Sequence, residues 1–160
     1  MPVDHELAAL LKRSSLTLAL AESCTGGLLA GRITALAGSS SYFLGGVVAY
    51  SNQVKEQLLR VPAALLAEHG AVSEAVARAM AEGARLVLAS DLALAVTGIA
   101  GPDGGTPEKP VGTVFLAVAD RRGCQVERFV FAGDREQVRQ QTVDQGVIML
   151  KKRLEAAKRA

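Results

Sequence analysis

The stretch LTLALAESCTGG, residues 16–27, is the part of the sequence that decides the fold. Its first half, 16–21, is a short apolar strand, and its second half ends in two glycines at the start of a helix. The helix is predicted over 25–37 from apolar residues that recur on one side of it: Leu28, Leu29, Ile33 and Leu36. A strand that leads directly into a helix is typical of layered α/β folds.

The same alternation continues along the rest of the chain. The apolar patterns predict further strands over 43–50 and 92–96, and helices over 52–59, 62–70, 73–87 and 136–158. Two more strands, 111–119 and 125–131, are separated by a tight turn at 120–123 and should therefore be antiparallel. The prediction is an α/β fold, a single layered domain over residues 1–160 with a mixed, mostly parallel sheet flanked by helices.

The composition excludes several classes of protein. A net charge of +2 does not by itself indicate nucleic-acid binding. No apolar run approaches the roughly 18 residues of a membrane helix, and the N-terminus does not resemble a signal peptide, so we expect a cytoplasmic protein without membrane contact. The two cysteines and two histidines match no ligand spacing, so we expect no metal site.

Ser23 lies where the first strand ends and the first glycine-containing turn begins. Free backbone N–H groups at Thr25, Gly26 and Gly27 can receive an oxyanion there, so Ser23 is a candidate nucleophile. The alternative is that Ser23 or Thr25 merely caps the helix, with the glycines present for packing.

A serine nucleophile needs a base, and neither histidine occupies an obvious position for it. Lys55 is the best of six lysines, because it follows a predicted buried strand and burial lowers the pKa of an amine. The alternative is an exposed lysine in the first turn of a helix. Tyr50 ends the same strand and can hold the base or the substrate, whereas Asn52 is a candidate helix cap. Cys24 is interpreted as a small buried residue.

Two further segments are candidates for phosphate binding. The loop 97–105 follows a strand and can present backbone N–H groups, with Thr97, Gly98, Gly101 and Gly105 as its candidate contacts. Arg135 and Arg139 are one helical turn apart and can bind a phosphate together, although surface arginines are the commoner case.

Four motifs taken in order resemble one family. They are AESCTGG (21–27), GG with YSN and Lys55 (45–55), TGIAGP with a second glycine pair (97–105), and KPVGT (109–113). Together they are similar to the CinA C-terminal domain family, the PncC-type nicotinamide mononucleotide deamidases, over roughly residues 7–154. The resemblance implies a hydrolase of pyridine nucleotide salvage that converts nicotinamide mononucleotide to nicotinate mononucleotide and ammonia without metal or cofactor.

The resemblance also implies roles for individual residues. Ser23 would be the nucleophile, Lys55 its general base, and Tyr50 a support for that pair or for the substrate. The substrate-binding residues would be Ser40, Asn52, Thr97, Gly98, Gly101, Gly105, Arg135 and Arg139, with either arginine as the phosphate ligand.

Rival functions remain open at this point. One is a non-enzymatic protein-binding module associated with competence and DNA damage, and another is an amidase for a different small amide. Many relatives carry an N-terminal domain similar to molybdopterin-binding proteins with pyrophosphatase activity; this sequence lacks it, so we expect deamidation only. The high apolar content of a small chain favours a homo-oligomer, with a dimer the commonest outcome.

Overall fold

Five strands form one mixed sheet in the computed structural model, which describes residues 2–158. The strands are β1 (Leu18–Glu22), β2 (Phe43–Val48), β3 (Leu92–Gly98), β4 (Thr113–Asp120) and β5 (Gly123–Val130), in the order β2-β1-β3-β4-β5. The strands β2, β1 and β3 are parallel, whereas β4 is antiparallel to both β3 and β5. The predicted mixed α/β fold is confirmed.

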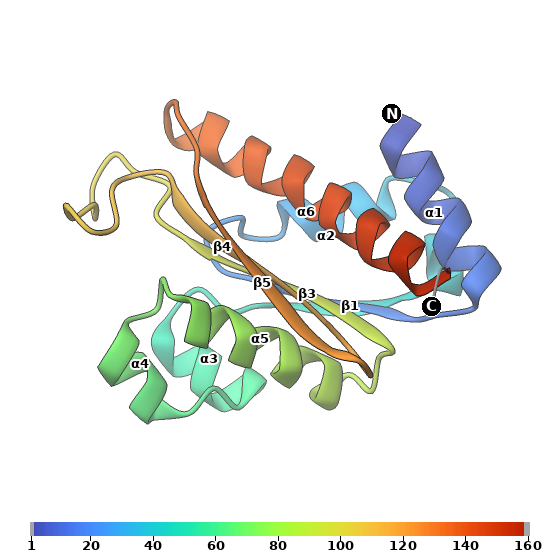
Figure 1. Ribbon diagram of the computed structural model, residues 1–160, viewed down its shortest axis with the longest axis horizontal. Helices are drawn as coiled ribbons and strands as arrows, with labels where there is room; N and C mark the ends of the chain where they lie inside the picture. The colour runs from blue at the N-terminus through green and yellow to red at the C-terminus, as the bar shows by residue number, and fades with distance from the viewer. Residues whose placement is uncertain (1, 159–160) are drawn as a thin grey trace.

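Helices cover both faces of this sheet (Figure 1). One face carries α1 (Pro2–Ser14), α2 (Leu28–Thr34) and α6 (Arg135–Lys158), and the other carries α3 (Asn52–Leu59), α4 (Ala63–His69) and α5 (Glu74–Val87). The result is three layers with the sheet in the middle. Within residues 2–158, no helix has both the length and the apolar character needed to cross a membrane.

The strands β1 and β3 explain why the sheet has two unequal faces. Their sequences, LALAE and LALAV, alternate leucine with alanine, and alternate residues of a strand point to opposite faces. The leucines lie in the core under α1, α2 and α6, and the alanines lie in the core under α3, α4 and α5. Each fully buried leucine contributes about 2–3 kcal/mol. The alanine face presents little side-chain volume, which lets α5 pack close to the sheet.

The predicted elements are all present, with ends displaced by a few residues. Ser73 caps α5 as expected, since its hydroxyl accepts a hydrogen bond from the Val76 amide at 3.3 Å. The helix α1 was not predicted, although its pattern contains the signal. Its buried Leu7, Leu10 and Leu11 recur at helical spacing, and Asp4 lies in its first turn.

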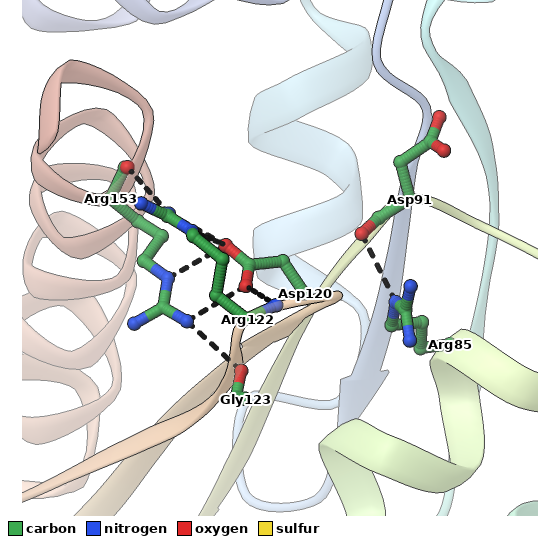
Figure 2. A network of polar contacts seen from close by, with 6 residues as sticks. All are labelled: Arg85, Asp91, Asp120, Arg122, Gly123 and Arg153. Carbon is green, nitrogen blue, oxygen red and sulfur yellow. Dashed lines mark hydrogen bonds and ion pairs between the residues drawn. The ribbon is translucent and has the colours of Figure 1, made fainter. Parts of the chain in front are cut away.

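The turn between β4 and β5 is held by a carboxylate that binds two arginines (Figure 2). Arg153 of α6 donates from Nε and Nη2 to the two oxygens of Asp120, each at 2.8 Å. The Arg122 amide and guanidinium donate to the same carboxylate. Burial favours the neutral acid, but the hydrogen bonds from Arg153 and Arg122 outweigh it and hold the Asp120 pKa well below its ordinary value. The ion pair between Arg153 and Asp120 thus holds α6 against the end of β4.

We predict that Asp120→Asn lowers the free energy of unfolding at pH 7 by about 2–3 kcal/mol, because Arg153 loses its charged acceptor. A carboxylate with a lowered folded-state pKa stabilises the fold above its unfolded-state pKa of about 4, and this contribution is lost as pH falls through the folded-state value. Urea unfolding at several pH values should therefore show the gap between wild type and variant closing below about pH 4. A gap that does not depend on pH would contradict this account.

Gly83 allows α5 to cross α3 closely. A Cβ atom at this position would lie 1.8 Å from the carbonyl oxygen of Leu59, the last residue of α3. We predict that Gly83→Ala destabilises the protein by about 2–3 kcal/mol in urea unfolding, since α3 must move away. The matched control is Gly31→Ala in α2, where an added Cβ meets nothing within 4 Å. That change should be neutral or stabilise by up to about 1 kcal/mol.

Candidate active site

Ser23 lies directly after β1, at the edge where the carboxyl ends of the parallel strands meet. Its amide donates to the Val96 carbonyl at 3.1 Å, which continues the β1–β3 pairing by one residue. The strand β2 follows β1 in the sequence and lies on one side of it in the sheet, whereas β3 lies on the other side of β1. Open α/β sheets bind their ligands at such a reversal of strand order.

Lys55 reaches Ser23 from the second turn of α3. Its Nζ lies 2.9 Å from the Ser23 Oγ, 2.7 Å from the Ala49 carbonyl and 3.2 Å from the Tyr50 carbonyl. The lysine is only 1% exposed and is the largest of the fully buried side chains. The alternative of an exposed lysine on a helix is therefore wrong.

Burial lowers the pKa of Lys55 below the ordinary value for lysine, and the neighbouring Cys24 opposes this only in part. As an ammonium, Nζ can donate to all three oxygens, including the Ser23 Oγ. As a neutral amine, it can donate to the two carbonyl oxygens and turn its lone pair to the Ser23 hydroxyl, which is the arrangement that a serine nucleophile and its base require.

Cys24 follows Ser23 but is unsuited to be the nucleophile. Burial raises the pKa of its thiol to about 11, so the thiol is protonated near neutral pH. The side chain is 6% exposed and belongs to the core under α2 and α6. Its interpretation as a small buried residue agrees with this placement.

A cavity of about 290 Å³ opens beside the Ser23–Lys55 pair. That volume is close to the lower end for small-molecule sites, roughly 300–1,000 Å³. Its walls include the proposed site residues Ser23, Lys55, Tyr50, Thr97, Gly98, Gly101 and Arg135. Larger hollows of about 510 and 630 Å³ lie along α5, but neither contains the serine or the lysine.

Other predicted residues do not reach this cavity. Asn52 is exposed at the start of α3, and the cap of that helix is Ser51, whose hydroxyl accepts from the Val54 amide at 3.2 Å. Gly105 packs against Val111 instead, where a Cβ would lie 2.8 Å from the Val111 nitrogen. Thr97, by contrast, does line the cavity, and its hydroxyl donates to the Ala71 carbonyl at 2.8 Å.

Ser40 lies at the opposite end of the sheet from Ser23. It belongs to a short 3₁₀ helix, Ser39–Ser41, which ends just before β2 begins, whereas Lys55 follows the other end of β2. The five steps of β2 span about 17 Å. The prediction that Ser40 lies near Ser23 is therefore wrong. The local sequence GSS carries no information on how far this turn lies from the site.

The structure separates the two arginines that the sequence left equivalent. Arg135, the first residue of α6, lines the cavity and donates to the Gly101 carbonyl at 2.7 Å and to the Tyr50 hydroxyl at 3.0 Å. Arg139 donates to the carbonyls of Cys24 and Thr25 at 3.0 and 3.2 Å. Arg139 thus holds the turn after Ser23, and of the two arginines only Arg135 lines the cavity.

The turn after Ser23 is organised by a residue that sequence reasoning missed. Glu22, 2% exposed, accepts hydrogen bonds from the Leu29 and Ala30 amides at 2.9 and 3.0 Å, and so caps α2 from the end of β1. The Gly26 amide donates to the Ser23 carbonyl at 3.1 Å and is therefore occupied. Thr25, Gly26 and Gly27 are not among the residues that line the cavity, whereas Cys24 is. Glu22 was not recognised because helix caps usually come from the residue next to the helix.

Asp103 is the second missed residue, and it lies on the cavity wall in the loop that follows β3. Among residues 2–158, no three His, Cys, Asp or Glu side chains form a group suited to a metal ion.

Comparison with known proteins agrees with the motifs. A family model described as the CinA C-terminal domain matches residues 1–154. The chain belongs to the CinA C-terminal domain family. It is 69% identical over 137 residues to a CinA-like protein of Citrifermentans bemidjiense, covering 86% of this chain and 33% of the relative. It is 62% identical over 152 residues to a CinA-like protein of Geobacter sulfurreducens, covering 95% of this chain and 37% of the relative. The chain thus spans about a third of the length of these curated relatives.

Solved structures of the CinA superfamily share the fold. A CinA superfamily protein from Klebsiella pneumoniae is 37% identical with a TM-score of 0.93, covering 97% of both chains. A competence/damage inducible protein from Agrobacterium tumefaciens is 39% identical with a TM-score of 0.88, covering 92% of this chain and 93% of that one.

We predict that Glu22→Gln lowers the free energy of unfolding of this CinA-family domain by about 1–3 kcal/mol. The glutamine side chain keeps one oxygen that can accept a hydrogen bond from α2. Its NH2 group replaces the other oxygen and would face a backbone N–H group, so one hydrogen bond is lost. The matched control is Glu74→Gln, since Glu74 lies in the first turn of α5 with its side chain 64% exposed. Chemical denaturation should show at most about 0.5 kcal/mol for that variant. Equal losses for the two variants would contradict a buried cap at Glu22.

Proposed function

We propose that the protein hydrolyses nicotinamide mononucleotide to nicotinate mononucleotide and ammonia, with Ser23 as nucleophile and Lys55 as general base. The observation that carries the proposal is the 2.9 Å contact between the Ser23 Oγ and a buried lysine Nζ. Serine–lysine pairs are a recognised variant of the serine, histidine and aspartate arrangement.

The first half of the reaction releases ammonia. The Ser23 Oγ attacks the carboxamide carbon while its proton moves to the Lys55 Nζ. The resulting tetrahedral intermediate then breaks its C–N bond as the Lys55 ammonium returns the proton to the leaving nitrogen. The two carbonyls that accept from Nζ keep the amine oriented through both transfers.

The second half restores the enzyme. A water molecule attacks the ester carbon while Lys55 takes one of its protons, and the C–O bond to Ser23 breaks. The proton on Lys55 returns to the serine oxygen, and the product forms as a carboxylic acid. This acid gives its remaining proton to the released ammonia or to bulk water, so the overall products are nicotinate mononucleotide as a carboxylate and an ammonium ion.

The oxyanion of both intermediates needs hydrogen-bond donors. We favour the Cys24 amide, because it directly follows the nucleophile and Cys24 lies on the cavity wall. The Gly26 amide is a weaker candidate, since it already donates to the Ser23 carbonyl. The amides of Thr25 and Gly27 remain predicted donors, and they would require substrate to reach the turn after Ser23.

The choice of substrate rests on two supports. The motifs resemble deamidases of nicotinamide mononucleotide, and Arg135 places a guanidinium on the cavity wall, where it can pair with a phosphate. A pyridinium ring also withdraws electrons from its carboxamide, which helps attack by a hydroxyl.

The decisive experiment incubates the purified protein with nicotinamide mononucleotide and measures both products. We expect ammonia and nicotinate mononucleotide in equal amounts, and a loss of at least about 10³-fold in kcat for Ser23→Ala with unchanged urea unfolding. Absence of ammonia from folded wild-type protein would reject the proposal. Other small amides would then be tried, and a protein-binding role after them.

Arg135 should contribute to binding through the phosphate. We predict that Arg135→Gln lowers kcat/KM for nicotinamide mononucleotide roughly ten- to hundred-fold. This range corresponds to the free energy that a hydrogen bond between charged groups contributes. The same variant should change kcat/KM for nicotinamide riboside, which lacks the phosphate, much less. The matched control is Arg13→Gln, because Arg13 is an exposed residue of α1. This variant should leave kcat/KM unchanged for both substrates. Equal losses with both substrates would assign Arg135 to holding the loop at Gly101.

A further inference from the structure

Asp103 brings a negative charge to a cavity that already contains a guanidinium. It is exposed, it lines the same cavity as Ser23 and Lys55, and it lies in the loop between β3 and β4. In the described part of the chain, its carboxylate takes part in none of the ion pairs. The mechanism proposed above does not use this charge.

Asp103 and Arg135 line the same cavity without forming an ion pair with each other. The Gly101 carbonyl accepts from Arg135 Nη1 at 2.7 Å, and Asp103 follows Gly101 by two residues. The Cα atoms of Gly101 and Asp103 are therefore at most about 7 Å apart. The cavity lining thus includes a cation held by two hydrogen bonds and a carboxylate that is not paired with it.

The cavity therefore offers opposite charges to a ligand that carries both signs. Nicotinamide mononucleotide is such a ligand, with an anionic phosphate and a cationic ring next to its carboxamide. Arg135 suits the phosphate, and a carboxylate suits the ring cation. A neutral amide of similar size would leave Asp103 without a partner, and a carboxylate gains nothing from a neutral ring.

We propose that Asp103 is a specificity residue that selects ligands with a pyridinium cation over ligands with a neutral ring. This inference rests on the proposed deamidase function, because it assumes that the carboxamide lies at Ser23. It extends that function by assigning recognition of the ring charge to one residue, Asp103. It also assigns the discrimination to electrostatics, which salt should weaken at this exposed position.

The test compares two ligands that differ in ring charge. Nicotinamide mononucleotide carries the cation, and its dihydro form keeps the ribose, phosphate and carboxamide with a neutral ring. We would measure KM for the first and the competitive inhibition constant of the second, for wild type and Asp103→Asn. We expect KM to rise roughly five- to twenty-fold in the variant, and the inhibition constant of the dihydro form to change less than about two-fold.

The matched control is Glu108→Gln, which removes the same charge from the same loop at a position outside the cavity lining. It should leave both constants unchanged, and the effect of Asp103→Asn should shrink at high ionic strength. An equal rise for both ligands, as expected for a contact to the ribose or for a collapsed loop, would overturn the proposal, as would no rise for either. Failure of wild type to produce ammonia would instead reject the deamidase function itself.

Discussion

The hydrogen bond between Lys55 and Ser23 is the interaction on which the site depends, and the lysine that makes it is almost completely shielded from water. Burying an amine disfavours its charged form, which is the physical reason that Lys55 can accept a proton. Two backbone carbonyls at the end of β2 provide its remaining polar contacts, so the buried nitrogen is not left without partners.

Several parts of the fold serve this one contact. The parallel pairing of β1 with β2 brings Ser23 and Ala49 to the same edge of the sheet, and the Ala49 amide donates to the Glu22 carbonyl at 2.8 Å. Gly83 lets α5 support α3, from which Lys55 extends. Glu22 fixes the start of α2, and Arg139 holds the carbonyls that follow Ser23. Ser23 and Lys55 are therefore positioned by contacts from both layers of helices.

The fold was largely predictable, because strand and helix periods are local properties. The leucine and alanine alternation of β1 and β3 and the cap at Ser73 are visible in short windows of sequence. The site was less predictable. Local pattern made Lys55 the best of six lysines but also allowed it to lie on an exposed helical turn, and the ordered motifs decided between these two interpretations. Its burial arises from the packing of α3 on α5, which no short window contains. For the same reason the sequence could not separate Arg135 from Arg139 or place Ser40, and the expected dimer stays a prediction.

The protonation state of Lys55 tests this account most directly. Protein labelled with ¹³C at the lysine Cε would be titrated by NMR, with Lys55→Met used to assign the resonance. The account predicts that Lys55 titrates clearly below the other lysines, whose ordinary pKa is about 10.4. A Lys55 resonance that titrates together with, or above, the exposed lysines would show a permanently charged side chain, and Ser23 would then have no base.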